Sequence, residues 1–114
     1  MILCKEFTFS AAHKLQDYID KDVNLHGHNY SLIVCVNGKV NSNGFVYDTR
    51  KINSAIKENV LDILDHKYLN DIIKQPSLEN VCIWIWQQLS KKIPLEEVKL
   101  YENPTLYAVY RGEQ

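Results

Sequence analysis

The chain has little of several features that would narrow its function at once. It holds three cysteines, an odd number without a CxxC spacing, which argues against a disulfide framework. The formal net charge is −1 and no block of lysine and arginine occurs, so no basic surface for nucleic acid is expected. No apolar run approaches the roughly 18 residues of a membrane span. These absences argue against nucleic-acid-binding, membrane-spanning and disulfide-stapled proteins.

The beginning of the sequence also lacks the features of a secretory signal. MILCKEFTFS reaches an acidic residue, Glu6, before any long apolar stretch has formed. Together with the cysteine usage, this favours a reducing, cytoplasmic setting. What is present is an ordinary globular balance, with 46% hydrophobic and 24% charged residues. At 114 residues we expect one domain, residues 1–114, with a single core.

Hydrophobic periodicity predicts an α+β domain in which two helices cover one face of a four-stranded antiparallel sheet, in the order ββααββ. Four segments alternate apolar and polar residues or are rich in β-branched residues, as is typical of strands. They are 5–13, 28–40, 97–101 and 105–111. Two segments between them have apolar residues at helical spacing, with Asp48 or Thr49 able to cap the first and Ser77 the second. The open edges of such a sheet are often paired in oligomers.

Three of the four histidines stand near the ends of neighbouring predicted strands. His26 and His28 are two residues apart in LHGHNY, so on a strand they point to the same face. His13 ends the adjacent predicted strand. Three neutral imidazoles with an open fourth position describe a catalytic zinc site, where the metal acidifies a bound water or hydroxyl. The alternative is a surface pair at a strand end, with His13 in a helix cap or the core.

Five blocks carry, in order and spacing, a resemblance to the 6-pyruvoyl-tetrahydropterin synthase family, which includes the 6-carboxytetrahydropterin synthases of the queuosine pathway. They are FTFSAAHKL, LHGHNY, LDHKYLN, PSLENV and YENPTLYAVYRG. This resemblance spans nearly the whole chain. It implies a T-fold subunit that assembles into a homohexamer around a barrel, with substrate sites between subunits. It also implies that Zn²⁺ is bound by His13, His26 and His28.

The same resemblance implies roles for further residues. Asp65 and His66 match the family's catalytic Asp-His pair. Without the resemblance, His66 would be a histidine favoured by the dipole at a helix C-terminus, and the two side chains can face each other only where the helix ends. Glu102 matches the carboxylate that anchors the pterin ring through two parallel hydrogen bonds. Ser77 either bonds the pterin or caps its helix, and Asp48 is most simply an N-cap.

One catalytic position departs from the family pattern. Typical members carry a cysteine in the loop before HGH, four residues ahead of the first histidine in the bacterial branch. That position is Asp22 here, while Cys4, Cys35 and Cys82 all resemble small core residues. Asp22 is either a carboxylate base, whose unperturbed pKa of about 3.9 burial would have to raise, or an ordinary loop aspartate.

The resemblance implies a zinc-dependent lyase acting on the side chain of 7,8-dihydroneopterin triphosphate. The default product is 6-carboxy-5,6,7,8-tetrahydropterin. A carboxylate in place of the cysteine raises 6-hydroxymethyl-dihydropterin as the alternative, because relatives with a glutamate in this loop are associated with that cleavage. A 6-pyruvoyl product is less expected, since its side-chain redox rearrangement most needs the thiol. The non-enzymatic alternative is a pterin- or purine-binding homo-oligomer with structural zinc. A zinc hydrolase is disfavoured by the Glu102 anchor.

Overall fold

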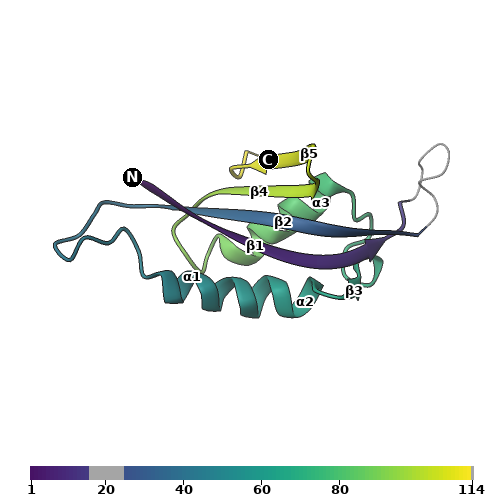
Figure 1. Ribbon diagram of the computed structural model, residues 1–114, viewed down its shortest axis with the longest axis horizontal. Coiled ribbons are helices and arrows are strands. Elements are labelled where there is room, and N and C mark those ends of the chain that lie inside the picture. Colours follow the sequence, from purple (N-terminus) through teal and green to yellow (C-terminus); the bar gives the residue numbers. More distant parts are fainter. Residues whose placement is uncertain (16–24, 114) are drawn as a thin grey trace.

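A computed structural model describes residues 1–15 and 25–113 of the chain, and it confirms the predicted α+β class. Figure 1 shows the long strands of one sheet, with α1 and α2 running along its length and α3 crossing behind it. The elements are β1 (Ile2–His13), β2 (His26–Asn37), α1 (Thr49–Ile56), η2 (Lys57–Leu61), α2 (Asp62–Leu64), β3 (Lys67–Tyr68), η3 (Leu69–Asp71), α3 (Leu78–Leu89), β4 (Leu95–Asn103) and β5 (Leu106–Tyr110).

The sheet has five strands in the order β3-β1-β2-β4-β5, so the prediction of four strands was wrong. The additional strand, β3, is only two residues long and pairs in parallel with Ala11 and Ala12 of β1. Two residues are too few to show the alternation by which a strand is recognised in a sequence. The other neighbouring strands pair antiparallel, as expected.

The predicted helix starts are confirmed. The Asp48 side chain accepts a hydrogen bond from the Arg50 N–H at 2.9 Å and caps α1. α1, η2 and α2 follow one another without interruption, with a π-helical turn in the middle. Ser77 caps α3 by accepting from the Asn80 N–H at 3.2 Å. Each cap satisfies one backbone donor that the first helical turn leaves free.

Alternate residues of β2 build the centre of the core. Tyr30, Leu32 and Val34 have no solvent exposure, and they pack with Ile52 of α1 and Ile85 of α3. Burying side chains of this size contributes about 1.5–3 kcal/mol each, which strongly disfavours a one-residue slip of the strand. The same alternation therefore determines the face to which residues 26 and 28 point. In the described part of the chain, no helix is long and apolar enough to cross a bilayer.

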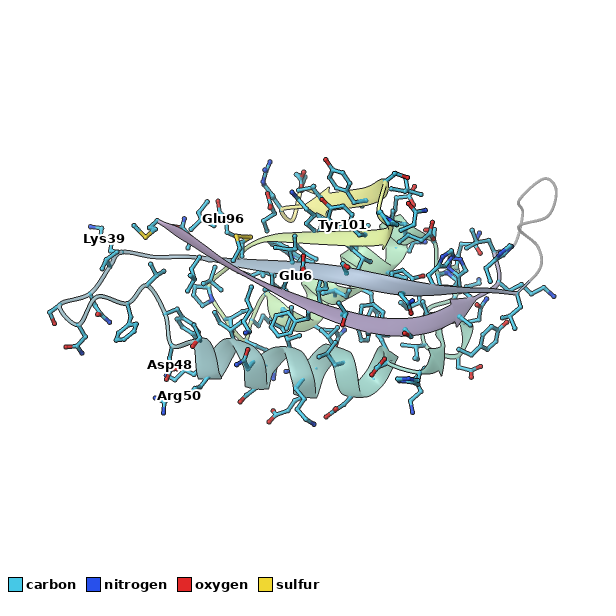
Figure 2. The ribbon with its side chains drawn as sticks, in the orientation of Figure 1. Glu6, Lys39, Asp48, Arg50, Glu96 and Tyr101 are labelled. Atoms are coloured by element: carbon cyan, nitrogen blue, oxygen red, sulfur yellow. A yellow bond between two sulfur atoms is a disulfide. The ribbon has the colours of Figure 1, made fainter. Side chains whose placement is uncertain are left out.

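A disulfide joins β1 and β2, which contradicts the expectation that the cysteines are unpaired. Cys4 and Cys35 lie directly opposite each other in the strand register and are bonded (S–S 2.08 Å; Figure 2). Cys4 is exposed rather than a core residue, whereas Cys82 is buried and free, and burial raises its pKa to about 12. Since disulfides persist mainly in oxidising compartments, the cysteines no longer support the predicted cytoplasmic setting.

Candidate metal centre and catalytic pair

The strand register brings all three sequence-predicted histidine ligands to one face. His13 is paired with His26 across β1 and β2, and Ala11 is paired with His28. Directly opposed residues of antiparallel strands point to the same side of the sheet, and so do residues two apart on one strand. The three imidazoles therefore share the helix-facing side with buried Tyr30. The expectation of a common face is confirmed.

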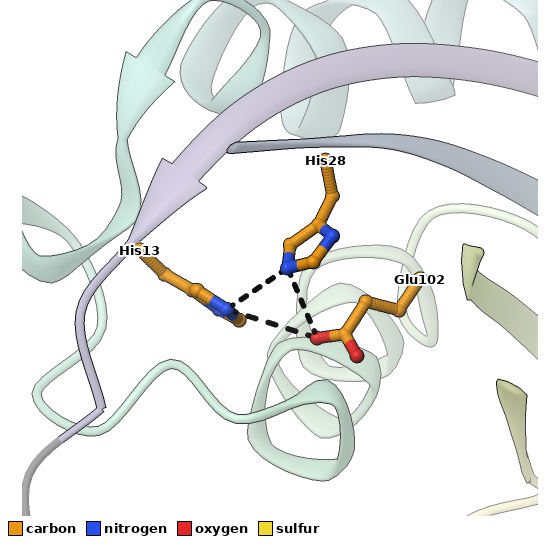
Figure 3. Close-up of side chains that lie close together, drawn as sticks. All are labelled: His13, His28 and Glu102. Atoms are coloured by element: carbon orange, nitrogen blue, oxygen red, sulfur yellow. Dashed lines mark hydrogen bonds and ion pairs between the residues drawn. The ribbon is translucent and has the colours of Figure 1, made fainter. Parts of the chain in front are cut away.

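Two of these histidines converge with Glu102 of β4 at the end of the sheet (Figure 3). The Nε2 atoms of His13 and His28 are 3.2 Å apart. Oε1 of Glu102 lies 3.8 Å from Nε2 of His13 and 3.7 Å from Nε2 of His28. His13 is 2% exposed, so the group lies at the border of the core. Three metal-ligating side chains from three strands thus face one point.

The tautomer of His13 follows from its outer hydrogen bond. Nδ1 lies 2.8 Å from the carbonyl oxygen of Pro76, which can only accept. The proton must therefore be on Nδ1, so the neutral ring directs the lone pair of Nε2 at His28 and Glu102. Metal-ligating histidines characteristically donate their second N–H in this way. The hydroxyl of Tyr30, 3.5 Å from the same Nδ1, is a weak neighbour by comparison.

The donor set fits a divalent metal ion. Zinc–nitrogen bonds of about 2.0–2.1 Å in a tetrahedron separate two ligand atoms by about 3.4 Å, close to the observed Nε2–Nε2 distance. The pKa of His28 lies below its usual value, chiefly because burial disfavours the charged ring, while Glu102 acts in the opposite direction. A neutral imidazole is the form that binds a metal. The Glu102 oxygen is slightly farther away than a ligand in this tetrahedron would be.

A β-bulge explains how Glu102 reaches this point. The register between β4 and β5 shifts between Tyr101 and Asn103, which leaves Glu102 as the extra residue. Bulges commonly redirect one side chain, and here the carboxylate points at the histidines (Figure 3). The sequence predicts that Glu102 contacts the pterin, whereas the structure places it beside the candidate ligands His13 and His28. Its only local signal is the turn that follows, at Asn103-Pro104.

The remaining predicted ligand, His26, is near but outside this close group. Its ring is 6.4 Å from that of His28, centroid to centroid, and the two planes are inclined by 17°. Ser77 follows Pro76, whose carbonyl holds His13, and its hydroxyl caps α3. Asp22 lies outside the described residues.

Asp65 and His66 form a hydrogen-bonded pair where the helix ends. α2 stops at Leu64, Asp65 is extended, and His66 has a left-handed backbone with φ of 59°. This turn lets neighbouring residues face each other, with Nδ1 of His66 3.0 Å from Oδ1 of Asp65. The Ser10 N–H donates to the same carboxylate oxygen at 3.0 Å and is the main cause of the lowered pKa of Asp65. An ionised Asp65 holds the Nδ1 proton and leaves Nε2 of the exposed His66 free to exchange protons.

An open cleft of about 470 Å³ lies beside the Asp65–His66 pair, because His66 is part of its wall. It is lined by Ser10, Ala11, Ala12, Gly27, His28, Asn29, His66, Lys67 and Tyr68. Sequence reasoning missed Ser10 and Asn29. They are opposite each other in the register, and the Ser10 hydroxyl donates to Oδ1 of Asn29 at 2.6 Å. Their positions inside the FTFSAAHKL and LHGHNY blocks were the available signal.

Comparison with known proteins identifies the family. The family model described as 6-pyruvoyl tetrahydropterin synthase matches residues 2–113. The chain belongs to this family. A 6-pyruvoyl tetrahydrobiopterin synthase of Dictyostelium discoideum is 37% identical, with 99% of this chain and 97% of that protein covered. A putative 6-carboxy-5,6,7,8-tetrahydropterin synthase of Archaeoglobus fulgidus is 35% identical over 97% and 96%. A dihydroneopterin monophosphate aldolase of Pyrococcus furiosus is 35% identical over 84% of each chain.

A solved structure of the same family confirms the fold. The Caenorhabditis elegans 6-pyruvoyl tetrahydropterin synthase superposes with a TM-score of 0.89 at 29% identity, covering 99% of this chain and 96% of that one. The chain therefore has the T-fold of the 6-pyruvoyl tetrahydropterin synthase family, as the resemblance implied. The five-stranded sheet described above departs from the expected four-stranded architecture.

Proposed function

We propose that this protein is a zinc-dependent lyase that cleaves the side chain of 7,8-dihydroneopterin triphosphate. The observation that carries the proposal is the convergence of His13, His28 and Glu102, with the lone pair of His13 Nε2 directed at the other two. Membership of a pterin-processing family supports the substrate class. The nearby Asp65–His66 pair supports proton-transfer chemistry.

His13, His26 and His28 are the proposed zinc ligands. The shared face of the three rings, and the position of His26 directly across from His13, support this set. When bound, zinc would act as a Lewis acid toward the side-chain oxygens of the substrate. Glu102, whose side chain is 14% exposed beside the histidines, is proposed to accept two ring N–H bonds and to orient the pterin.

The chain's own groups would move the protons. His66 is the proposed general base and acid, acting through its free Nε2, while Asp65 holds the opposite nitrogen. Asp22 is proposed as a second base in place of the family's cysteine. Ser77 can serve both of its predicted roles, because its oxygen accepts the capping N–H and its hydroxyl proton stays available to the pterin.

The proposed product is 6-carboxy-5,6,7,8-tetrahydropterin, as in the queuosine pathway, and the name of the Archaeoglobus relative supports it. The alternative is 6-hydroxymethyl-dihydropterin, supported by Asp22 at the cysteine position and by the name of the Pyrococcus relative. A 6-pyruvoyl product is the third outcome. A pterin-binding oligomer without catalysis is the non-enzymatic alternative.

A homohexamer with sites between subunits is proposed as the working form. Both edges of the sheet support pairing with other copies. β3 covers only Ala11 and Ala12 on the edge of β1 that faces away from β2, so most of that edge has no partner in the described chain. β5 forms the opposite edge. Long open edges of this kind are usually paired or protected in stable proteins.

Metal analysis combined with a product assay tests this function. Purified protein is expected to hold about one zinc ion per chain and to convert 7,8-dihydroneopterin triphosphate, with products resolved by mass. His28→Ala should lose both zinc and turnover. His66→Ala should keep the zinc and lose turnover, which separates the metal centre from the proton relay. Protein without zinc, or zinc retained in His28→Ala, would refute the metal assignment. Pterin binding without turnover would establish the non-enzymatic alternative.

A further inference from the structure

The disulfide between β1 and β2 has unequal surroundings at its two ends (Figure 2). Cys4 is exposed, whereas Cys35 is 2% exposed. The difference follows from the sheet order. Because β3 pairs only with Ala11 and Ala12, β1 is the edge of the described sheet at Cys4, while Cys35 has β1 on one side and β4 on the other. The Cys4 end of the bond is therefore open, and the Cys35 end is enclosed.

Glu97 of β4 closes the Cys35 end of the bond. It is directly opposite Cys35 in the β2–β4 register, and its Oε2 lies 4.0 Å from Sγ of Cys35. Its other oxygen, Oε1, accepts from two nitrogens of the Arg111 guanidinium at 3.0 and 2.7 Å, which holds the carboxylate in this position. The Glu97–Arg111 pair therefore occupies the β4 side of Cys35.

Thiol–disulfide exchange would be sensitive to this asymmetry. A thiolate attacks one sulfur from the side opposite the S–S bond, and the electron pair of that bond leaves on the other sulfur. The bond joins directly opposed residues of neighbouring strands, so it spans from β1 to β2. The path to Cys4 therefore comes from the open edge of β1, whereas the path to Cys35 comes from β4, where Glu97 stands.

We propose that Cys4 is a site of mixed-disulfide formation with small thiols such as glutathione, and that Cys35 is the resolving thiol. In the forward step, the thiolate of the small thiol forms a bond to Sγ of Cys4, the Cys4–Cys35 bond breaks, and Cys35 leaves as a thiolate that takes up a proton. In the reverse step, the Cys35 thiolate attacks Sγ of Cys4 and expels the small thiol. The strand pairing from Ile2 to His13 keeps Cys35 opposite Cys4 for this step.

The exchange site is independent of the proposed lyase function and remote from the metal centre. Cys4 and His13 lie near opposite ends of β1, about 30 Å apart at about 3.4 Å per residue. Modification of Cys4 removes the covalent link between β1 and β2 and should leave the zinc content unchanged. The third cysteine, Cys82, is buried, and burial raises its pKa to about 12, so it offers little thiolate to compete.

A matched pair of substitutions tests the assignment. Cys35→Ser leaves Cys4 free to react and Cys4→Ser leaves Cys35, with buried Cys82 present in both. Each folded variant is incubated with oxidised glutathione, and the modified cysteine is identified by peptide mass spectrometry. The Cys35→Ser variant should form the mixed disulfide at least about tenfold faster, because burial limits both access and thiolate formation at Cys35. In urea the two variants should react at similar rates.

The unsubstituted protein gives a second readout. A limiting amount of reduced glutathione, followed by rapid alkylation, should place glutathione on Cys4 and the alkyl group on Cys35. In the Cys4→Ser background, Glu97→Ala should raise the rate at Cys35 severalfold, whereas Glu96→Ala, its neighbour on β4, should not. Equal rates in the two folded variants, or faster modification of Cys35, would overturn the assignment. Slow reaction of both would also overturn it, because Cys4 would then be covered in the assembled protein.

Discussion

His26 and Glu102 differ in what their removal should do to the metal centre. Both lie beside the close pair of His13 and His28. The sequence predicts His26 as the third zinc ligand, whereas in the structure Glu102 is the residue grouped with that pair. We expect His26→Ala to remove a zinc ligand and Glu102→Gln to remove the pterin anchor. His26→Ala should therefore weaken zinc binding more than Glu102→Gln does, and Glu102→Gln should weaken pterin binding more than His26→Ala does.

The distances set the expected magnitudes. The Nε2 atoms of His13 and His28 are 3.2 Å apart, but the Glu102 oxygen is 3.7–3.8 Å from each. A carboxylate next to the ligands, rather than bound to the metal, contributes as an outer-shell group, where losses are about 10- to 100-fold. Glutamine keeps the shape and one acceptor oxygen, so we expect the lower end of that range. Loss of the His26 ligand should exceed about 100-fold.

For pterin affinity, we expect the opposite ranking of the two variants, with the larger loss in Glu102→Gln. Glutamine would present an NH₂ donor to a ring N–H donor, so one of two charge-assisted bonds is replaced by a repulsive contact. A loss of about 1.5–3 kcal/mol corresponds to roughly 10- to 150-fold weaker binding of neopterin. His26→Ala, measured at saturating zinc, should leave Glu102 in place and weaken neopterin binding less.

Competition with a chromophoric zinc chelator would give the zinc affinities, and calorimetry with neopterin the pterin affinities. Glu96→Gln makes the same chemical change at the far end of β4, and it should alter neither (Figure 2). If Glu102→Gln weakened zinc binding more than His26→Ala did, the ligand set would be His13, His28 and Glu102. The assignment of Glu102 as pterin anchor would then be refuted.

Three further results are expected. In zinc-free protein, NMR titration should place the pKa of His28 below 6.5, because burial lowers it, and lower still in Glu102→Gln, because Glu102 raises it. The folded protein then binds fewer protons at His28 than the unfolded chain does. Urea unfolding should therefore show a free energy of unfolding that declines as pH falls through about 6.5. Asp65→Asn should lower kcat about 10²- to 10⁴-fold at nearly unchanged KM. Asparagine Oδ1 can still accept the Ser10 N–H, but the charge that orients His66 is lost. An unchanged kcat would remove the pair from the mechanism. Reducing Cys4–Cys35, which are 31 residues apart, should lower the unfolding free energy by about 3–4 kcal/mol in denaturant titrations, and a Cys4→Ser/Cys35→Ser variant should be insensitive to the reductant.

Local sequence was sufficient for the elements and for the face that carries the histidines. The alternation that buries Tyr30 and Leu32 continues back through His28 and His26, so one pattern predicted both the core and the common direction of the imidazoles. The caps at Asp48 and Ser77 were equally local, because a cap bonds a backbone N–H two or three residues away. The Asp65–His66 pair was expected to work only at a helix end, and the helix does end there.

Tertiary structure alone decided the contacts between segments far apart in the chain. The Pro76 carbonyl that sets the tautomer of His13 is 63 residues away from it, and the Cys4–Cys35 bond depends on which residues of β1 and β2 are opposed. Glu102 reaches the histidines through a bulge, and β3 exists only because β1 is beside it. Periodicity records which face of an element is buried. Register, bulges and the approach of one element to another depend on packing of the whole chain, so no local pattern could predict them.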